Sequence, residues 1–259
     1  MTALLQVQGL CKTFGGLKAV RDLSFEVREG EIVGLIGPNG AGKSTAFNLI
    51  SGALRPTAGS VRFGGREIAG LAPSRVVQHG LARTFQSASV YGAATVRENL
   101  FRGAISKLGV PFAGQLLGTA AYRRRLDEID DEIDAVLDIT GLQAVREHRA
   151  GELAYGYQKR LGVAIGLATR PRLLLLDEPA AGLNPEECAE FGRLLQRVRT
   201  HYGLTLLFVE HHMALVMGTC ERIVVLVQGQ KIAEGGPDAI RGNPAVVEAY
   251  LGVPQHAEA

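Results

Sequence analysis

The sequence predicts an α/β fold built on a parallel sheet, with an antiparallel β region before the sheet and a helical insertion within it. The first observation is a set of continuous apolar runs, typical of strands that are buried on both faces. The second is a pair of alternating segments near the N-terminus, and the third is a stretch of helical periodicity in the middle of the chain. With 259 residues, the chain can bury a large core, and we expect one domain over residues 1–259.

The N-terminal region predicts short antiparallel strands. In residues 5–7 and 24–27, apolar positions alternate with polar ones, as in strands that expose one face. Residues 61–63 repeat this alternation and are expected to pair with the first two segments. Together they predict an N-terminal antiparallel β-subdomain.

The parallel sheet is predicted from four apolar runs that lack alternation. Such runs indicate strands covered by other elements on both sides. They are residues 32–36, 172–177, 205–209 and 223–227.

The pattern becomes helical between these runs, and we expect a helical subdomain over residues 95–165. Leu126, Ile129, Ile133, Val136 and Leu137 fall on one face of an acidic helix. Its charged residues are interpreted as a solvated face, on which Arg124 and Glu128 have the spacing of an i,i+4 ion pair. Residues 235–259 predict a C-terminal tail that contains a turn and a short helix.

Composition excludes several classes of protein. Hydrophobic residues make up 46% of the chain, charged residues 21%, and the formal net charge is only +2. This balance is typical of globular proteins, and we expect no nucleic-acid partner. The three cysteines are odd in number and widely spaced, which favours a reducing compartment over a disulfide framework. Because no apolar run is long enough to span a membrane, we expect a cytoplasmic protein whose membrane contact comes through a partner.

A phosphate-binding loop is the most specific motif in the chain. The segment from Gly37 to Thr45 fits G-x-x-x-x-G-K-[ST], between a predicted strand and a predicted helix. Glycines allow a tight turn in which backbone N–H groups face phosphate, Lys43 reaches the outer phosphates and Ser44 ligates magnesium. The motif predicts a P-loop NTPase core. The nucleotide-binding positions are Gly37, Pro38, Asn39, Gly40, Ala41, Gly42, Lys43, Ser44 and Thr45.

Two carboxylates follow the apolar run at 172–177, at the edge where open parallel sheets bind their ligands. Asp177 is expected to hold magnesium, directly or through water. Glu178 is expected to orient or deprotonate the water that attacks the γ-phosphate. With the phosphate loop, these residues supply both halves of a nucleotide and magnesium site.

The order of motifs over nearly the whole chain resembles the ATP-binding subunits of ABC transporters. Residues 153–158 stand where that family carries its signature, usually Leu-Ser-Gly-Gly-Gln. The resemblance implies an ABC ATPase fold with ATP and Mg²⁺ as ligands. It also implies three further roles: Phe14 stacks on adenine, Gln86 senses magnesium and the attacking water, and His211 is the switch histidine.

In the family that this chain resembles, two ATP-binding subunits meet head to tail, so the signature of one covers the ATP held by the other. The resemblance therefore implies a homodimer, or a heterodimer with a similar ATP-binding subunit. It also implies integral membrane transporter subunits, a solute-binding protein that acts indirectly, and a location on the inner face of the cell membrane. The signature residues expected to contact the partner's nucleotide are Leu153, Ala154, Tyr155 and Gly156.

Several details are most similar to the branched-chain amino acid group, and within it to the larger of the two ATP-binding subunits. They are the segment from Phe14 to Ala19, Tyr155-Gly156, the segment from Ala181 to Asn184, and Glu248 with the residues that follow it. Urea importers share much of this pattern and are the first alternative. A non-transport ABC protein and a nucleotide-gated binding module are alternatives from other classes.

Two positions depart from the family pattern. Ala154 occupies the place of a serine whose hydroxyl contacts the γ-phosphate, so we expect slower hydrolysis or weaker closure at the composite site that it completes. His212 follows the switch histidine where the family often has aspartate, a change that nothing in the sequence explains.

Overall fold

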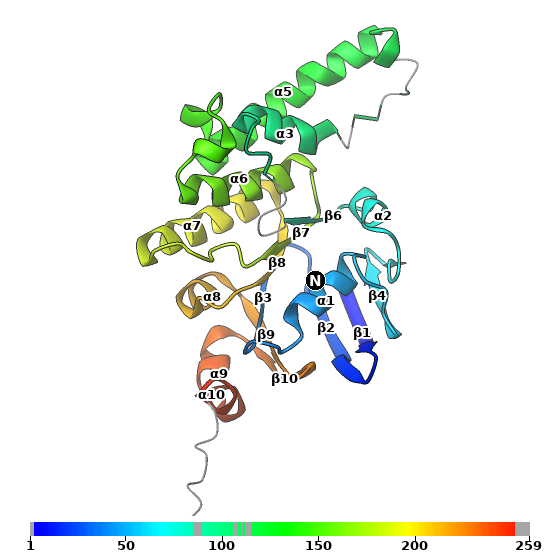
Figure 1. The fold of residues 1–259 in the computed structure, drawn as a ribbon, viewed down its shortest axis with the longest axis vertical. Helices are drawn as coiled ribbons and strands as arrows, with labels where there is room; N and C mark the ends of the chain where they lie inside the picture. The colour runs from blue at the N-terminus through cyan, green and yellow to red at the C-terminus, as the bar shows by residue number, and fades with distance from the viewer. Residues whose placement is uncertain (1–2, 85–89, 106–107, 110, 112–114, 252–259) are drawn as a thin grey trace, which may run out of the picture.

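The computed structural model describes residues 3–84, 90–105, 108–109, 111 and 115–251. Figure 1 shows a central sheet between a group of helices drawn in green at the top and the blue N-terminal strands at the lower right. The last two helices, α9 and α10, lie at the opposite end from α3 and α5. These layers place helices and a second sheet on the two sides of the central sheet.

The predicted N-terminal strands are confirmed and form a four-stranded sheet within the described residues, in the order β2-β1-β4-β5. The pairs within it are antiparallel. The alternation has its expected cause, because Leu5 and Val7 are buried while Gln6 between them is partly exposed. The strands are β1 (Ala3–Phe14), β2 (Leu17–Arg28), β4 (Ala58–Phe63) and β5 (Arg66–Glu67).

The four apolar runs form adjacent parallel strands, as predicted. In the described residues the central sheet has the order β10-β9-β3-β8-β7-β6, with only the β10 and β9 pair antiparallel. The two edge strands, β6 and β10, were not predicted. The strands are β3 (Ile32–Ile36), β6 (Leu81–Thr84), β7 (Leu173–Asp177), β8 (Thr205–Val209), β9 (Arg222–Val227) and β10 (Gln230–Gly235).

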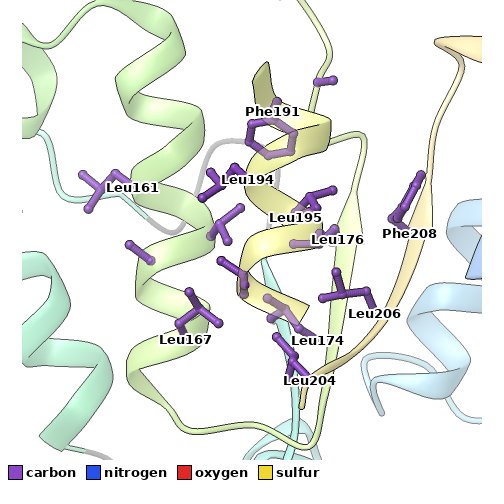
Figure 2. Close-up of a cluster of buried hydrophobic side chains, with 14 of the residues drawn as sticks. Leu161, Leu167, Leu174, Leu176, Phe191, Leu194, Leu195, Leu204, Leu206 and Phe208 are labelled. Carbon is purple, nitrogen blue, oxygen red and sulfur yellow. The ribbon is translucent and has the colours of Figure 1, made fainter. Parts of the chain in front are cut away.

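Successive residues of the central strands enter two separate hydrophobic clusters. In β7, Leu174 and Leu176 pack with helices α6 and α7, as Figure 2 shows, whereas Leu173 and Leu175 pack with the N-terminal sheet and helix α1. Both faces are therefore buried, which explains why these strands show continuous apolar runs. The helices are α1 (Lys43–Ile50), α2 (Pro73–Gln78), α3 (Val96–Ala104), α5 (Ala120–Thr140), α6 (Tyr155–Ala168), α7 (Pro185–Tyr202), α8 (Met213–Thr219), α9 (Pro237–Arg241) and α10 (Pro244–Leu251).

Helix α5 has the predicted apolar face. Ile129, Ile133 and Leu137 are almost fully buried on it. The prediction that Arg124 pairs with Glu128 is wrong. The carboxylate of Glu128 instead accepts from the Nη1 of Arg125 at 2.8 Å. Arg125 also reaches Glu132 at 3.1 Å, so its side chain joins two carboxylates along the same face.

The C-terminal residues after β10 form α9 and α10 rather than one short helix. Pro237 and Pro244 begin these helices, which suits a residue that lacks a backbone N–H. In the part of the chain that the structure describes, no helix combines the length and the apolar character needed to cross a membrane.

Candidate functional site

Three neighbouring parallel strands end at one edge of the central sheet, and each is followed by a residue that shapes the site. Gly37 follows β3, Glu178 follows β7 and Glu210 follows β8. Asp177 pairs in register with Val209, and Leu35 pairs with the same residue from the other side. The carboxyl edge of the sheet therefore gathers these loops, as open parallel sheets do at their ligand sites.

The phosphate loop is held in a shape that only small residues permit. At Gly37, where φ is 153°, an added Cβ would lie 2.1 Å from the backbone oxygen of Leu226. At Gly42, where φ is 98°, it would lie 2.5 Å from the backbone oxygen of Ala19. The loop leads into α1, whose first N–H groups have no intrahelical acceptor and are available to an anion.

Lys43 lies folded against this loop. Its side chain is buried, and its Nζ donates to the carbonyl oxygens of Gly37 at 2.7 Å and Pro38 at 2.9 Å. Burial lowers the pKa of the Lys43 ammonium, while the carboxylates of Glu178 and Asp177 partly offset this effect. The ammonium is thus placed at the loop where phosphates would bind.

The lowered pKa gives a first prediction. The protonated amine attracts phosphate, so loss of its proton should weaken ATP binding, and this should begin below pH 10.5, the ordinary value for lysine. A fluorescent ATP analogue titrated between pH 7 and 10.5 measures the affinity. Lys43→Arg is the control. Because the arginine guanidinium stays charged, the affinity of this variant for the ATP analogue should not change with pH over this range. A flat profile for the natural chain as well would contradict the prediction.

Glu178 and His211 form a close pair. The Nε2 of His211 lies 2.6 Å from the Oε1 of Glu178, so a ring protonated on Nε2 donates to the carboxylate. Glu178 has a left-handed backbone, with φ of 47°, and its N–H donates to the carbonyl of Val209 at 2.9 Å. A left-handed conformation costs a residue with a side chain roughly 1–2 kcal/mol, and such strain is concentrated at functional sites.

Asp177 is tied to a residue that was not predicted. Its Oδ2 accepts from the Nη2 of Arg83 at 2.6 Å, in a largely buried ion pair. The Nη1 of Arg83 also donates to Asn48 and Ser51 in α1 and the residue after it. Arg83 therefore joins the end of β6, the phosphate-loop helix and the carboxylate that was expected to hold magnesium.

A cavity of about 590 Å³ opens between these elements. Phe14, Lys43, Ser44, Glu178 and His211 all line it, so the structure brings together most residues predicted for nucleotide binding and hydrolysis. The other predicted residues of the phosphate loop that line it are Asn39, Gly40, Ala41, Gly42 and Thr45. The lining residues that were not predicted for the site are Leu17, Lys18, Ala19, Arg21 and Gln228.

The predicted signature lies away from this cavity, at the start of α6. Leu153 is buried, whereas Ala154 is exposed at the N-cap position and forms no side-chain cap. The hydroxyl of Tyr155 donates to the carbonyl of Ala181 at 2.9 Å, and its ring occupies the space beside Gly182. Residues 153–156 thus lie outside the cavity that contains Lys43 and contact the loop after Glu178 instead.

Gln86, expected to sense magnesium, lies outside the described residues. Arg83 and Glu210 were missed, although Arg83 begins the Arg-Thr-Phe-Gln segment that contains Gln86. Nothing in the sequence marks Glu210, because its role depends on burial and on contacts made in the folded chain.

The donors and acceptors of the cavity fit a nucleoside triphosphate with a hard divalent cation. Backbone N–H groups and Lys43 face the anion side, and the loop keeps this shape because glycines at 37 and 42 let it approach the backbone of neighbouring segments. The hydroxyl of Ser44 in the cavity and the carboxylate of Asp177, one residue before Glu178, are oxygen ligands of the kind that Mg²⁺ prefers. The ring of Phe14, 44% exposed at the rim, offers a surface on which a base can stack.

Two family models match the chain. The ABC transporter model covers residues 20–181, which includes the phosphate loop, the signature segment and Glu178. The model of the branched-chain amino acid ATP-binding cassette transporter covers residues 230–256, from β10 to beyond α10.

Relatives and solved structures are similar over nearly the full length. The high-affinity branched-chain amino acid transport ATP-binding protein LivG of Salmonella typhimurium is 45% identical over 96% of this chain and 98% of its own. The corresponding protein BraF of Pseudomonas aeruginosa is 43% identical over the same shares. The ADP conformation of MJ1267, an ATP-binding cassette of an ABC transporter, superposes with a TM-score of 0.85 at 30% identity, covering 98% of this chain and all of that one.

Proposed function

The chain belongs to the ABC transporter family, and on this premise we propose that it is the ATP-hydrolysing subunit that powers import of branched-chain amino acids. The observation that carries the hydrolytic role is the cavity in which the phosphate loop faces the close pair of Glu178 and His211. The substrate class is supported by the family model over residues 230–256 and by the similarity to LivG and BraF.

Hydrolysis requires an attack of water on the γ-phosphate, and this chain supplies the groups around that step. Glu178 accepts the proton of the water, and His211 holds the carboxylate through the 2.6 Å contact at Nε2. Lys43 leaves the carbonyls of its own loop to face the outer phosphates, whose charge it neutralises. Gln86 is proposed to orient the water. Mg²⁺, held by Ser44, Asp177 and Gln86, would supply further charge neutralisation when bound.

Residues 153–156 are proposed to complete the ATP site of a second subunit. They lie outside this chain's own cavity, and the N–H groups at the start of α6 are available to an anion. ATP between the two subunits would then hold the dimer closed, and hydrolysis would release it. The second subunit is a copy of this chain or a similar ATP-binding subunit.

The exposed N-cap gives a second prediction. Ala154→Ser adds a hydroxyl that can accept from an N–H of α6, which should stabilise the fold by about 1 kcal/mol. The same hydroxyl would donate to the γ-phosphate of the partner's ATP, so turnover or ATP affinity of the dimer should rise. Thermal unfolding and ATPase assays measure the two effects. Ala154→Val, which lacks the hydroxyl, should give neither gain, and an unchanged Ala154→Ser protein would refute the prediction.

Membership of the ABC transporter family supports a proposal for the other subunits of the assembly. We propose that integral membrane subunits form the pathway, that a solute-binding protein delivers the amino acid, and that this chain sits on the cytoplasmic face of the membrane. Residues 1–259 would act as one ABC-type domain with a helical subdomain over about 95–165 and a C-terminal tail over 235–259.

Uptake of labelled solutes tests the proposed substrate class. A strain whose only copy carries Glu178→Gln should lose uptake of leucine, isoleucine and valine, while uptake of urea stays normal. Loss of urea uptake alone would show a urea importer. Normal uptake of all four, with the variant protein present at the wild-type level, would contradict a role in their import.

A further inference from the structure

Glu210 is a buried carboxylate at the carboxyl edge of the central sheet, and it takes no part in the proposed chemistry. It is 1% exposed and follows β8 directly. Its Oε1 accepts from the N–H of Ala180 at 2.7 Å, and its Oε2 accepts from the N–H groups of His211 at 2.9 Å and His212 at 3.2 Å. Within the described residues no cationic side chain pairs with it, so backbone dipoles stabilise its charge.

These hydrogen bonds join two loops, and the residues that bond across them, Ala180 and Glu210, are 30 residues apart in the chain. Ala180 lies two residues after Glu178, on the loop that follows β7. His211 is the second residue of the loop that follows β8, directly after Glu210. Each oxygen of Glu210 therefore accepts from the backbone of one of the two loops. The contact between His211 and Glu178 joins the same two loops.

We propose that Glu210 is a positioning residue for ATP hydrolysis, which holds the two loops so that His211 lies against Glu178. Glu210 is not among the residues that line the cavity, and it acts through the backbone of the histidine. Because Glu178 has a strained left-handed backbone and the His211 side chain is 41% exposed, their 2.6 Å contact depends on support from the surroundings. This inference rests on the proposed hydrolysis of ATP at this site.

The chemistry of an amide shows why a carboxylate is required. Glutamine has one acceptor oxygen, and its NH₂ group would face an N–H donor on one of the two loops. Glu210→Gln keeps the shape of the side chain but must lose the bond to Ala180 or the bonds to His211 and His212. A displacement of about 1 Å in a catalytic pair can lower a rate by roughly a hundredfold.

The test measures kcat and ATP affinity in the purified transporter complex. Glu210→Gln should lower kcat by about tenfold or more, while affinity for a fluorescent ATP analogue stays within about twofold, because the hydrogen bonds of Glu210 go to the loops after β7 and β8 and Glu210 does not line the cavity. Glu210→Gln should change kcat by less than about twofold when His211→Ala is already present, since there is then no pair to position. Equal losses in both backgrounds would overturn the proposal.

A matched control separates positioning from general stability. Glu31, 9% exposed at the opposite end of β3, accepts from the N–H of Arg28 at 2.9 Å and from the guanidinium of Arg222 at 2.7 Å. Glu31→Gln should lower the melting temperature and leave kcat unchanged at temperatures where the protein is folded. Glu178→Gln, assayed beside them, tests the hydrolytic site itself. A normal kcat in Glu210→Gln beside a lost kcat in Glu178→Gln contradicts this inference alone.

Discussion

Glu178→Gln should lower ATP hydrolysis by a factor of about 10²–10⁴ while leaving ATP bound. An amide keeps the size of the side chain and can retain a contact with His211, but it cannot accept the proton of the attacking water. Binding should persist, because the phosphate loop and Lys43 are untouched. Phosphate release and binding of a fluorescent ATP analogue measure the two effects, and ATP should hold the variant as a closed dimer.

The control for this prediction is Glu186→Gln, at an exposed acidic position in the first turn of α7. It makes the same chemical change close to the site but outside the cavity, and hydrolysis should be normal. If Glu178→Gln hydrolyses ATP within about threefold of the natural chain, another group accepts the proton and the proposed role of Glu178 is wrong.

Gly37→Ala should abolish ATP binding and lower the free energy of unfolding by about 3 kcal/mol. The added Cβ would lie 2.1 Å from the carbonyl oxygen of Leu226 and 3.0 Å from the Cβ of Ala41. Because the first contact is with backbone in β9, it cannot be relieved by a change of rotamer, and the loop itself must move. That movement would displace the backbone N–H groups of the loop and of the start of α1, which are the groups available to the phosphates. Chemical denaturation and nucleotide titration provide the measurements.

Gly65→Ala separates the steric conflict from backbone strain. Gly65 has φ of 79°, and an added Cβ there meets nothing within 4 Å. Gly65→Ala should lower the free energy of unfolding by only about 1–2 kcal/mol, which is the strain of a left-handed conformation, and it should not affect ATP binding. If Gly37→Ala were no worse than Gly65→Ala in both assays, the close approach of β9 to the phosphate loop would have no energetic importance.

Sequence reasoning succeeded where one local pattern determines the outcome. The strands β3, β7, β8 and β9 are confirmed because burial on both faces demands an uninterrupted apolar run. The apolar face of α5 is confirmed because apolar residues spaced three or four positions apart lie on one side of a helix. Phe14, Lys43, Ser44, Glu178 and His211 were expected at a nucleotide site from motifs and resemblance, and they line a common cavity.

The missed elements depend on contacts across the chain. Strand β6 has only four residues and two of them are polar, so its identity comes from pairing with β7. Strand β10 is mostly exposed and antiparallel, which gives it no apolar run. Edge strands of this kind are specified by a neighbour rather than by their own pattern.

The same limit applies to the polar side chains of the site. Arg83 and Asp177 are 94 residues apart, and only the pairing of β6 with β7 brings them into a buried ion pair. In the sequence, Glu210 does not differ from an ordinary loop carboxylate. Its role depends on the three backbone N–H groups that donate to it in the folded chain. The expected pair of Arg124 with Glu128 failed for a related reason, since Arg125 lies nearer to two carboxylates at once.

The strand order of the central sheet has a consequence for the synthesis of this protein. In the described part of the chain, the strands that pair with β3, which leads into the phosphate loop, are β8 and β9, and both are translated more than 160 residues after it. A chain still growing on the ribosome presents the glycine-rich loop long before the sheet that shapes it exists. The nascent protein should therefore be unable to bind ATP until β9 has left the exit tunnel, which restricts nucleotide binding to chains in which both neighbours of β3 have already been made.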